Sequence, residues 1–409
     1  MLATPSIAII GAGAAGLFTA ARLSQLGLGR NVEIFEKTRK PAAKILISGG
    51  GRCNVTHHCF TPQELVKAYP RGNKELLGPF LRFQPKDMIE WLESRGVKLK
   101  TEEDGRIFPL SDQSQEIADC LISCAQDGGA SLHLSSGIDQ IQVLEDGRFE
   151  LSGSFGKKIF DYVLLATGSQ PTGHRLAASI GHNLISSVPS LFSFHLKDFN
   201  WQDLAGVSAS VKVKLEKGPW MQEGPLLITH WGFSGPAILK LSSWAARHLH
   251  ETQYQETLWV DWLPHISQES LEKELVESKK ESKPLYRAIP SLSRSLICKM
   301  LVEMEIDPET KTSKLSDKLC KQIALRLKRS SHSICGQSTH KQEFVTCGGV
   351  DLKEVDFRSF QSKIHPGLFF AGEILNIDAI TGGFNFQNAW TGGWHIATFI
   401  YEEATKKFL

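Results

Sequence analysis

The sequence predicts an α/β protein in which a Rossmann-like parallel sheet is split by an inserted β-rich domain and a helical subdomain. The first observation is an apolar run, residues 7–10, that leads directly into the pattern Gly11-x-Gly13-x-x-Gly16. The second is a return to glycine-rich, apolar sequence after residue 344, with a different composition in between. These observations predict one dinucleotide-binding fold that is interrupted by another part of the chain.

The three glycines of the N-terminal pattern have different expected roles. Gly11 allows a tight turn after the first strand, Gly13 lets the backbone approach a pyrophosphate, and Gly16 lets the helix pack closely on the sheet. Ala14 and Ala15 begin the helix, whose free N–H groups and positive dipole end favour an anion. The pattern therefore predicts a dinucleotide site at the start of the chain.

Glu36 closes the next apolar run, residues 31–36, at the distance expected of a residue that binds ribose. Its carboxylate is placed to accept hydrogen bonds from a ribose diol, and it would repel a 2′-phosphate. We therefore expect FAD or NAD rather than NADP at this site, with Lys37 beside it.

Composition sets further limits on function. The chain has 409 residues, a formal charge of +2, and eight cysteines without a C-x-x-C pair, which predicts no metal site and cytosolic thiols. No charged side chain precedes Arg22, but Pro5 and the glycines interrupt this stretch, so we expect neither a signal peptide nor a membrane span. A cytoplasmic protein is the expectation.

Changes of pattern along the chain predict its domains. Helical periods dominate residues 61–128, an antiparallel meander is expected over 131–167, and a strand buried on both faces is expected over 162–165. The predicted domains are the first part of the dinucleotide-binding domain (1–187), an inserted β-rich domain (188–268), a helical basic subdomain (269–330), a return strand of the inserted domain (331–343) and the second part of the dinucleotide-binding domain (344–409).

The helical subdomain ends in a basic segment. Residues 311–329 contain seven Lys or Arg and one acid, and Lys314, Lys318 and Lys321 are spaced to share one helical face. Such a stripe is typical either of a solvated helix face or of a surface that binds nucleic acid.

Three separated motifs together resemble flavoproteins of the glutathione-reductase type: the N-terminal pattern, residues 166–168 and residues 367–373. More closely, residues 44–56, 230–237 and 372–385 resemble the BaiN/RdsA (YhiN-type) family of bacterial flavoproteins, over nearly the whole chain. This resemblance implies an FAD domain interrupted by a barrel-like domain. Members of that family have been assigned reduction of a uridine in ribosomal RNA, reduction of steroid enones, and oxidation of an aminoketone.

The resemblance also implies which residues hold FAD. Gly11, Gly13, Gly16 and Glu36 would hold the ADP half. The other residues expected at the cofactor are Lys44, Gly51, Arg52, Asn54, Thr167, Gly168, Gly372, Glu373, Gly382, Gly383, Phe384 and Asn385. Two positions depart from the family pattern: Asn376 stands where relatives usually have an acid, and Gly168-Ser169-Gln170 replaces a double glycine.

Three residues are candidates for catalysis. Saturating an activated C=C bond requires a hydride and a proton, and Cys53 is the candidate proton donor, with Arg52 placed to polarise a substrate carbonyl. Arg52 is also expected to lower the pKa of the thiol, and a thiolate is a poor acid, so packing beside the flavin is the alternative role of Cys53. His230 either faces the same cleft or is a structural residue.

These observations favour an FAD-dependent oxidoreductase that reduces a conjugated C=C bond, with a uracil of ribosomal RNA ahead of a small enone. The alternatives are an oxidase of an amine or small ketone, and an RNA-binding protein with a structural flavin. No second G-x-G-x-x-G occurs between residues 100 and 190, so NAD(P)H is expected to bind only transiently as electron donor. Ribosomal RNA and this small-molecule donor are the expected partners, and no membrane partner is expected.

Overall fold

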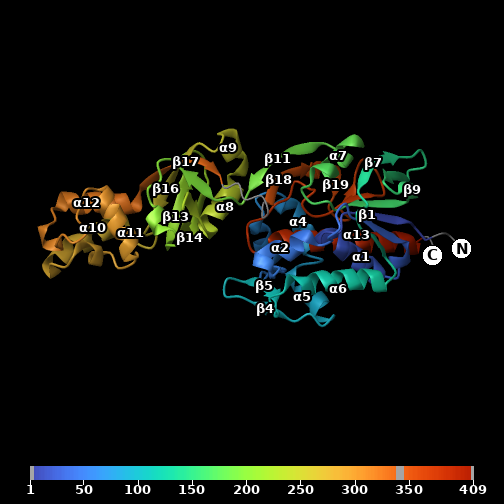
Figure 1. The fold of residues 1–409 in the computed structure, drawn as a ribbon, viewed down its shortest axis with the longest axis horizontal. Coiled ribbons are helices and arrows are strands. Elements are labelled where there is room, and N and C mark those ends of the chain that lie inside the picture. Colours follow the sequence, from blue (N-terminus) through green and yellow to red (C-terminus); the bar gives the residue numbers. More distant parts are fainter. Residues whose placement is uncertain (1–3, 338–344, 407–409) are drawn as a thin grey trace. The chain divides into compact units, whose positions relative to one another are not determined.

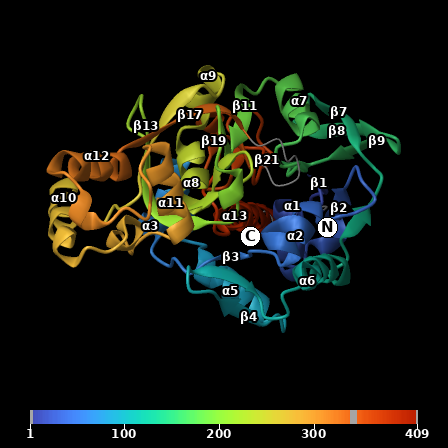
Figure 2. The same ribbon diagram turned by 60° about the vertical axis from the view of Figure 1, so that its left-hand side comes forward.

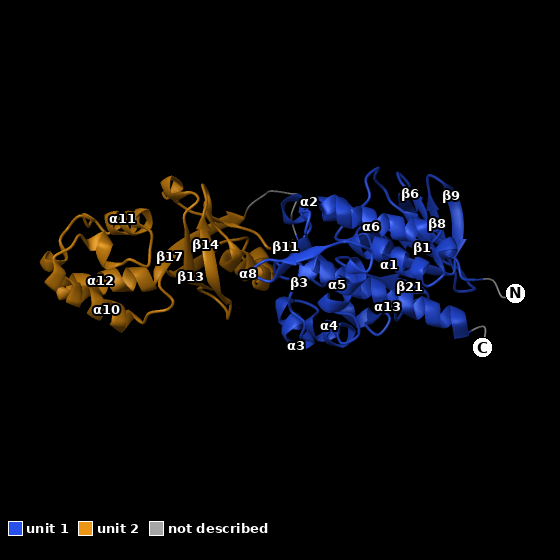
Figure 3. Ribbon diagram, turned by 90° about the horizontal axis from the view of Figure 1, so that it is seen from below, with its two compact units in different colours: residues 1–188, 345–409 blue, residues 189–344 orange. Residues whose placement is uncertain are grey.

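The computed structural model describes residues 4–337 and 345–406 and divides the chain into two compact units (Figure 3). The first unit comprises residues 1–188 and 345–409, and the second comprises residues 189–344. The second unit is therefore a single insertion between two parts of the first. In the described residues, no helix combines the length and the apolar character needed to cross a membrane.

The first unit is built on a seven-stranded sheet with the strand order β19-β20-β21-β10-β1-β2-β6. Its strands are β1 (Ile7–Ile10), β2 (Val32–Phe35), β6 (Ser131–His133), β10 (Tyr162–Leu165), β19 (Val355–Asp356), β20 (Gln361–Ser362) and β21 (Leu368–Phe370). The five strands from β21 to β6 pair in parallel, whereas β20 pairs antiparallel with β19 and β21. β21 lies far from β10 in the chain and pairs with it directly.

The apolar runs become the inner strands because both of their faces are covered. All four residues of β1 are buried, and β1 lies between β2 and β10. The helix α1 (Ala14–Gln25) packs against α13 (Phe384–Lys406) and α6 (Ser114–Asp127), and Figures 1 and 2 show these helices beside the sheet. Buried parallel strands of this kind are typical of doubly wound α/β folds.

Smaller elements surround this sheet. One three-stranded antiparallel sheet consists of β3 (Thr56–His57), β5 (Arg106–Pro109) and β4 (Leu99–Thr101). A second consists of β7 (Ile138–Val143), β8 (Phe149–Gly153) and β9 (Gly156–Phe160). A two-stranded sheet is formed by β11 (Leu184–Ser190) and β18 (Val345–Val350). The other helices of the unit are α2 (Ala43–Gly51), α3 (Pro62–Leu65), α4 (Asn73–Phe80), α5 (Pro85–Glu93) and α7 (Pro171–Ser179).

The prediction of an antiparallel meander over residues 131–167 is correct only for the middle of this stretch. β7, β8 and β9 form it, but β6 and β10 leave it and pair in parallel within the large sheet. Periodicity along a strand shows which residues face the core, but it does not show which strand will be the partner. The predicted helical stretch 61–128 likewise contains two short strands, β4 and β5.

The second unit contains a closed barrel with the order β12-β15-β14-β13-β16-β17. Its strands are β12 (Phe194–Leu196), β13 (Ser208–Leu215), β14 (Met221–Ile228), β15 (Gly232–Ser234), β16 (Glu256–Asp261) and β17 (Ser330–Gln337). Along the second half of β13 the odd-numbered residues Val211, Val213 and Leu215 are buried, so alternation directs one face to the core. The expected return strand 331–343 falls on β17, except for residues 338–343, which lie outside the described residues.

Helices complete the second unit. They are α8 (Pro236–Trp244), α9 (Ala246–Glu251), α10 (Gln268–Glu277), α11 (Arg294–Glu303) and α12 (Asp317–Lys328). The sequence predicts that Lys314, Lys318 and Lys321 share one helical face, and this prediction is wrong for Lys314. Lys314 ends a separate 3-10 turn, Thr312–Lys314, and Leu315 and Ser316 are extended before α12 begins. Only Lys318 and Lys321 therefore share the helix.

His332 is a mostly buried basic group that packs among aromatic side chains of the barrel. Its ring packs against Phe233 and Trp201, with centroid distances of 4.8 and 5.4 Å, and Nε2 lies 2.9 Å from Ser330 Oγ. Burial, with a smaller contribution from nearby Arg326, lowers the pKa of His332 to about 3. The neutral ring is therefore part of the folded core.

We expect His332 to make the second unit less stable as the pH falls from about 6.5 toward 3. Over this range the unfolded chain binds a proton at His332 that the folded chain does not bind, which favours unfolding. Between pH 7 and pH 5 the loss is about 2 kcal/mol. Urea unfolding followed by tryptophan fluorescence should show this loss in the wild type and in His250→Asn, an exposed control, but not in His332→Asn. An equal pH dependence in all three proteins would contradict it.

Candidate functional site

The turn between β1 and α1 is closed by backbone contacts that exclude side chains. Gly11 has a φ of +108°, and a Cβ there would lie 2.5 Å from the carbonyl oxygen of Ala166. A Cβ at Gly16 would lie 2.0 Å from the carbonyl oxygen of Gly11. These two glycines are therefore required by the fold itself, and they bring the loop after β10, with Thr167, against the turn.

Gly13 is different, because a Cβ at this position would meet nothing within 4 Å. It caps α1 without any side-chain hydrogen bond, and the first turn of α1, with Ala14 and Ala15, contains no acid. The end of this helix is thus open to a ligand and carries a partial positive charge. An anion such as a pyrophosphate fits this place.

Glu36 lies directly after β2, beside this turn. One carboxylate oxygen accepts a hydrogen bond from the backbone N–H of Ala12 at 3.0 Å, and the other accepts from Thr38 N and Oγ1 at 2.8 and 2.9 Å. The carboxylate is therefore held rigidly at the end of the strand, and Lys37 beside it is exposed. Together with the open helix end, these residues fit the ADP half of a dinucleotide.

Three distant segments meet at an ion pair. Lys44, near the start of α2, pairs with Glu373, which follows β21 in the segment that begins at Gly372. Lys44 Nζ also lies 3.4 Å from Ser169 Oγ in the loop after β10, and Glu373 Oε2 lies 3.8 Å from the place of a Cβ on Gly168. The structure thus brings together residues that the sequence motifs place more than 100 positions apart.

Gly372 lies where two helices approach each other. A Cβ added there would be 3.5 Å from Ala15 Cβ in α1 and 3.7 Å from Ala389 Cβ in α13. Its φ of +77° is also unfavourable for other residues. The end of β21 is consequently held against the helix that begins the predicted pyrophosphate site.

The N-terminal end of α13 contacts the loop after α2. A Cβ on Gly383 would lie 2.6 Å from the Thr56 backbone, and the Asn54 amide, oriented to satisfy both groups, accepts from Gly383 N at 2.9 Å and donates to Thr56 O at 3.1 Å. Phe384 stacks on the ring of His57 at 4.6 Å. Gly51, where a Cβ would have only one neighbour within 4 Å, is the last residue of α2, and Gly382 lies in the segment that leads into α13.

Asn385, in the first turn of α13, fixes the loop that precedes this helix. Its side chain accepts a hydrogen bond from Ala379 N at 3.0 Å and donates to Ala379 O at 3.2 Å. The loop is also held by a buried ion pair between Arg71 and the fully buried Asp378. In the same loop the side-chain oxygen of Asn376, a departure from the family pattern, is buried and has no hydrogen-bond partner in the described structure.

The side chain of Arg52 contacts Glu102 and Phe108 of the first unit. Its Nη1 donates to Glu102 Oε1 at 2.6 Å, and its guanidinium lies 4.1 Å from the centre of the Phe108 ring. The hydrogen bond to Glu102 raises the pKa of Arg52. Arg52 also lies 3.7 Å from Asp112 Oδ1 and donates to Gly49 O at 3.3 Å, and none of these partners is a predicted site residue.

The expectation that Arg52 lowers the pKa of the Cys53 thiol is wrong. Cys53 is completely buried, and this burial raises its pKa to about 12, opposed only by a hydrogen bond with Ser48. The thiol therefore remains protonated at neutral pH and packs in the core of the first unit. A proton donor has to reach its substrate, so this geometry favours the packing role.

His230 belongs to the second unit. It is exposed in the turn after β14, next to Trp231. This turn lies at the end of the barrel that carries helices α10–α12, because β14 runs in the same direction as β16, which leads into α10. The chain enters and leaves the second unit at the opposite end of the barrel. His230 therefore lies in a different unit from the predicted FAD-binding residues.

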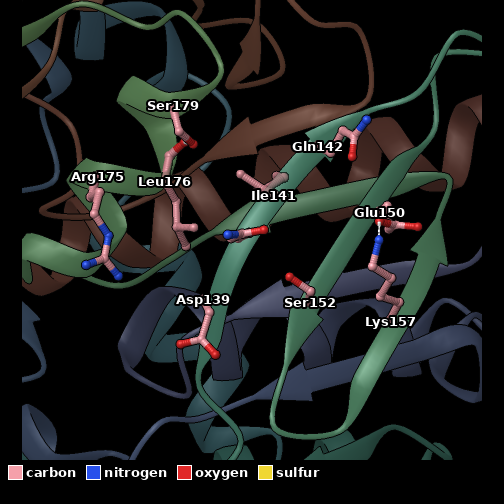
Figure 4. Close-up of a pocket in the computed structure, with 10 residues that line it drawn as sticks. Asp139, Ile141, Gln142, Glu150, Ser152, Lys157, Arg175, Leu176 and Ser179 are labelled. Atoms are coloured by element: carbon pink, nitrogen blue, oxygen red, sulfur yellow. Dashed lines mark hydrogen bonds and ion pairs between the residues drawn. The ribbon is translucent and has the colours of Figure 1, made fainter.

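Sequence reasoning missed the buried Arg71–Asp378 pair and the Lys44–Glu373 contact. No local sequence pattern indicates that Arg71 and Asp378 form an ion pair, because only the fold brings these two residues together. A third unpredicted feature is a pocket of about 610 Å³ between the β7–β9 sheet and α7, which contains Asp139, Arg175 and Ser179 (Figure 4). None of the predicted site residues lines it, so it is separate from the dinucleotide-binding residues.

The fold and the nucleotide-binding residues define a flavoprotein-type oxidoreductase with a Rossmann-like domain. The chain belongs to the HI0933-like family, since the model of the HI0933-like protein Rossmann domain matches residues 5–399. This finding confirms the predicted family and fold class, and with them an FAD-dependent oxidoreductase as the class of enzyme.

Named relatives cover almost the whole chain. The ribosomal RNA dihydrouridine synthase of Escherichia coli (strain K12) is 29% identical over 408 residues, which are 95% of this chain and 96% of the relative. The 3-dehydro-bile acid delta(4,6)-reductase of Clostridium scindens is 26% identical over 404 residues, 95% of this chain and 97% of the relative.

A solved structure supports the fold. The 3-ketosteroid-delta4-(5alpha)-dehydrogenase from Rhodococcus jostii RHA1 has a TM-score of 0.54 at 12% identity, over 97% of this chain and 96% of that chain. At this identity the likeness concerns the fold alone.

We expect Glu36→Arg to lose FAD. The change removes a carboxylate that is held at the end of β2 and places a cation there, and hydrogen bonds to a charged group contribute about 1.5–3 kcal/mol each. The FAD content of the purified protein should fall at least tenfold, measured by absorbance after release of the flavin. Glu33→Gln, on the same strand, is the matched control and should retain FAD. Full FAD content in folded Glu36→Arg would exclude the proposed role.

Cys53 should resist alkylation in the folded protein. With a pKa of about 12 and no exposed surface, it should react with iodoacetamide at pH 8 roughly a thousandfold more slowly than an ordinary exposed thiol. Cys335, which is exposed, is the internal control. Mass spectrometry of peptides after timed labelling measures both sites in one sample. Equal labelling of the two cysteines would contradict the buried position.

Proposed function

We propose that this protein catalyses the NAD(P)H-driven reduction of a conjugated C=C bond, with a uridine of large-subunit ribosomal RNA, reduced to dihydrouridine, as the favoured substrate. The reaction consumes NAD(P)H and one proton and yields NAD(P)⁺ and the saturated ring. FAD, when bound, supplies the hydride carrier between the two reactants. A ribosomal RNA substrate agrees with the expected cytoplasmic location.

The observation that carries the flavin chemistry is the convergence, in the first unit, of the turn between β1 and α1, the end of β2, the start of α2, the loop after β10 and the segment after β21. The turn with Gly11, Gly13 and Gly16 and the carboxylate of Glu36 hold the ADP half in this proposal. Lys44, Thr167, Gly168 and Glu373 surround the middle of the cofactor. This set combines an open helix end, a fixed carboxylate and an ion pair, each suited to a phosphate or a hydroxyl group.

The N-terminal end of α13 has a further proposed role. No acid lies in its first turn, and Gly382 and Gly383 lead into it without side chains. Such a helix end stabilises nearby negative charge by about 0.3–1 kcal/mol. For a two-electron couple this corresponds to roughly 6–20 mV. We infer that Gly382, Gly383 and Asn385 fix this helix end toward the flavin ring and ease its reduction.

This proposal assigns the proton donor to none of the three residues predicted for catalysis. Cys53 is buried, and Arg52 is held by Glu102 and Phe108, so neither is assigned to a catalytic contact in this proposal. His230 is likewise left without a catalytic role.

The choice of RNA over a small molecule rests on the second unit. Lys311, Lys314, Lys318 and Lys321 are exposed, and none of them forms an ion pair with a described residue. A polyanion would neutralise them, whereas a small enone would not need them. The name of the Clostridium scindens relative supports a small enone as the alternative substrate.

An anaerobic experiment tests this function. The flavin absorbance of the purified protein should bleach when NADH or NADPH is added, and unmodified ribosomal RNA should then restore it, with dihydrouridine detected in the RNA by mass spectrometry. Ribosomal RNA that already carries dihydrouridine is the control and should leave the flavin reduced. Recovery only with oxygen or with a small enone would overturn the RNA substrate, and a flavin that never bleaches would overturn the reductase.

A further inference from the structure

Trp231 is an unusual side chain in the second unit. Its indole is 66% exposed, whereas Trp201 and Trp262 of the same unit are almost completely buried. A large apolar ring left in water forgoes the stabilisation that burial would provide. Tryptophan is enriched at surfaces where proteins bind partners, relative to the rest of the protein surface.

The backbone that carries this ring is fixed. Thr229 Oγ1 accepts hydrogen bonds from Trp231 N at 3.3 Å and Gly232 N at 3.2 Å, and Leu196 N donates to Trp231 O at 3.1 Å. A Cβ at Gly232, which has a φ of +153°, would lie 2.3 Å from the carbonyl oxygen of Phe194. The turn therefore holds an exposed ring on a rigid support, so little entropy is lost when a ligand stacks on it.

The surroundings of Trp231 are polar and aromatic. The His195 ring lies 6.5 Å from the indole, measured between ring centroids, and His230 beside it is exposed. A flat indole next to imidazoles suits a planar, hydrogen-bonding ring better than an aliphatic ligand.

Trp231 lies at the same end of the barrel as the basic helices. β12, β14 and β16 all run toward this end, and the segment after β16 contacts the end of α12 through a hydrogen bond from Trp262 N to Leu327 O at 2.9 Å. Figure 1 shows α10, α11 and α12 together beside the barrel. Lys318 and Lys321 on α12 are among the exposed lysines that form no ion pair with a described residue.

We propose that Trp231 is a stacking platform for an unpaired base of RNA, and that the lysines of the same barrel end bind its phosphates. Single-stranded nucleic acid is recognised by this combination of an aromatic ring and cations, because every base has a stacking face and every linkage a charge. The inference rests on the proposed function and adds the contact by which the second unit holds the substrate. It needs no contact between Trp231 and the reacting ring.

The test measures binding of fluorescein-labelled twelve-residue oligouridine to the full-length, FAD-loaded protein over a series of salt concentrations. Trp231→Ala should raise Kd roughly five- to a hundredfold at every salt concentration, whereas Trp231→Phe should stay within a few-fold of the wild type. The salt slope should be unchanged in Trp231→Ala, because stacking releases no counterions. The double variant Lys318→Gln/Lys321→Gln should instead lower the slope by up to two phosphate contacts.

Met221→Ala is the matched control. Met221 is 47% exposed at the opposite end of β14, so its removal tests the loss of an exposed apolar group without the stack. Kd should be unchanged in this variant. Unchanged binding in Trp231→Ala, or no binding of the oligonucleotide by the wild type, would overturn the platform.

The anaerobic assay with ribosomal RNA separates this failure from failure of the proposed function. If Trp231→Ala binds normally and RNA still restores the flavin absorbance, only the platform is wrong. If RNA neither binds nor restores the absorbance, the RNA substrate is wrong as well.

Discussion

Backbone contacts too short for any side chain close the turn between β1 and α1, and the nucleotide-binding part of the protein depends on them. The carbonyl oxygen of Ala166 lies 2.5 Å from the place of a Cβ on Gly11, and that of Gly11 lies 2.0 Å from the place of a Cβ on Gly16. These contacts set the distance between the end of β10 and the start of α1. Because β10 also pairs with β21, they bring the segment with Glu373 to the same edge of the sheet. The ends of parallel strands are the usual place for ligands in such folds.

The second constraint is the division of the first unit into two parts of the chain. β21 and α13 come after the insertion, yet β21 pairs with β10, and α13 packs against α1. The first unit is therefore complete only when both ends of the chain have folded together. An inserted barrel satisfies this requirement because its six strands close on themselves and leave no unpaired edge for the large sheet to join.

Charge is distributed between the two units in different ways. In the first unit, ion pairs join Lys44 to Glu373 and Arg71 to Asp378 near the nucleotide-binding residues. In the second unit several lysines of the segment 311–321 have no ion-pair partner among the described residues, and an indole on a rigid turn is exposed. Paired charges fix a site, whereas unpaired cations on a surface attract an anionic partner.

The sequence by itself determined the nucleotide-binding fold. Glycines at positions where any side chain would clash, and an acid directly after a strand, form a pattern that is visible in the local sequence. It also indicated the split domain, since the glycine-rich texture returns after residue 344. Only the tertiary structure decided the state of Cys53 and the partners of Arg52, Lys44 and Asp378. Burial and long-range pairing depend on residues far away in the chain. The directions of the barrel strands likewise decide at which end of the barrel His230 and Trp231 lie, and no local sequence pattern indicates these directions.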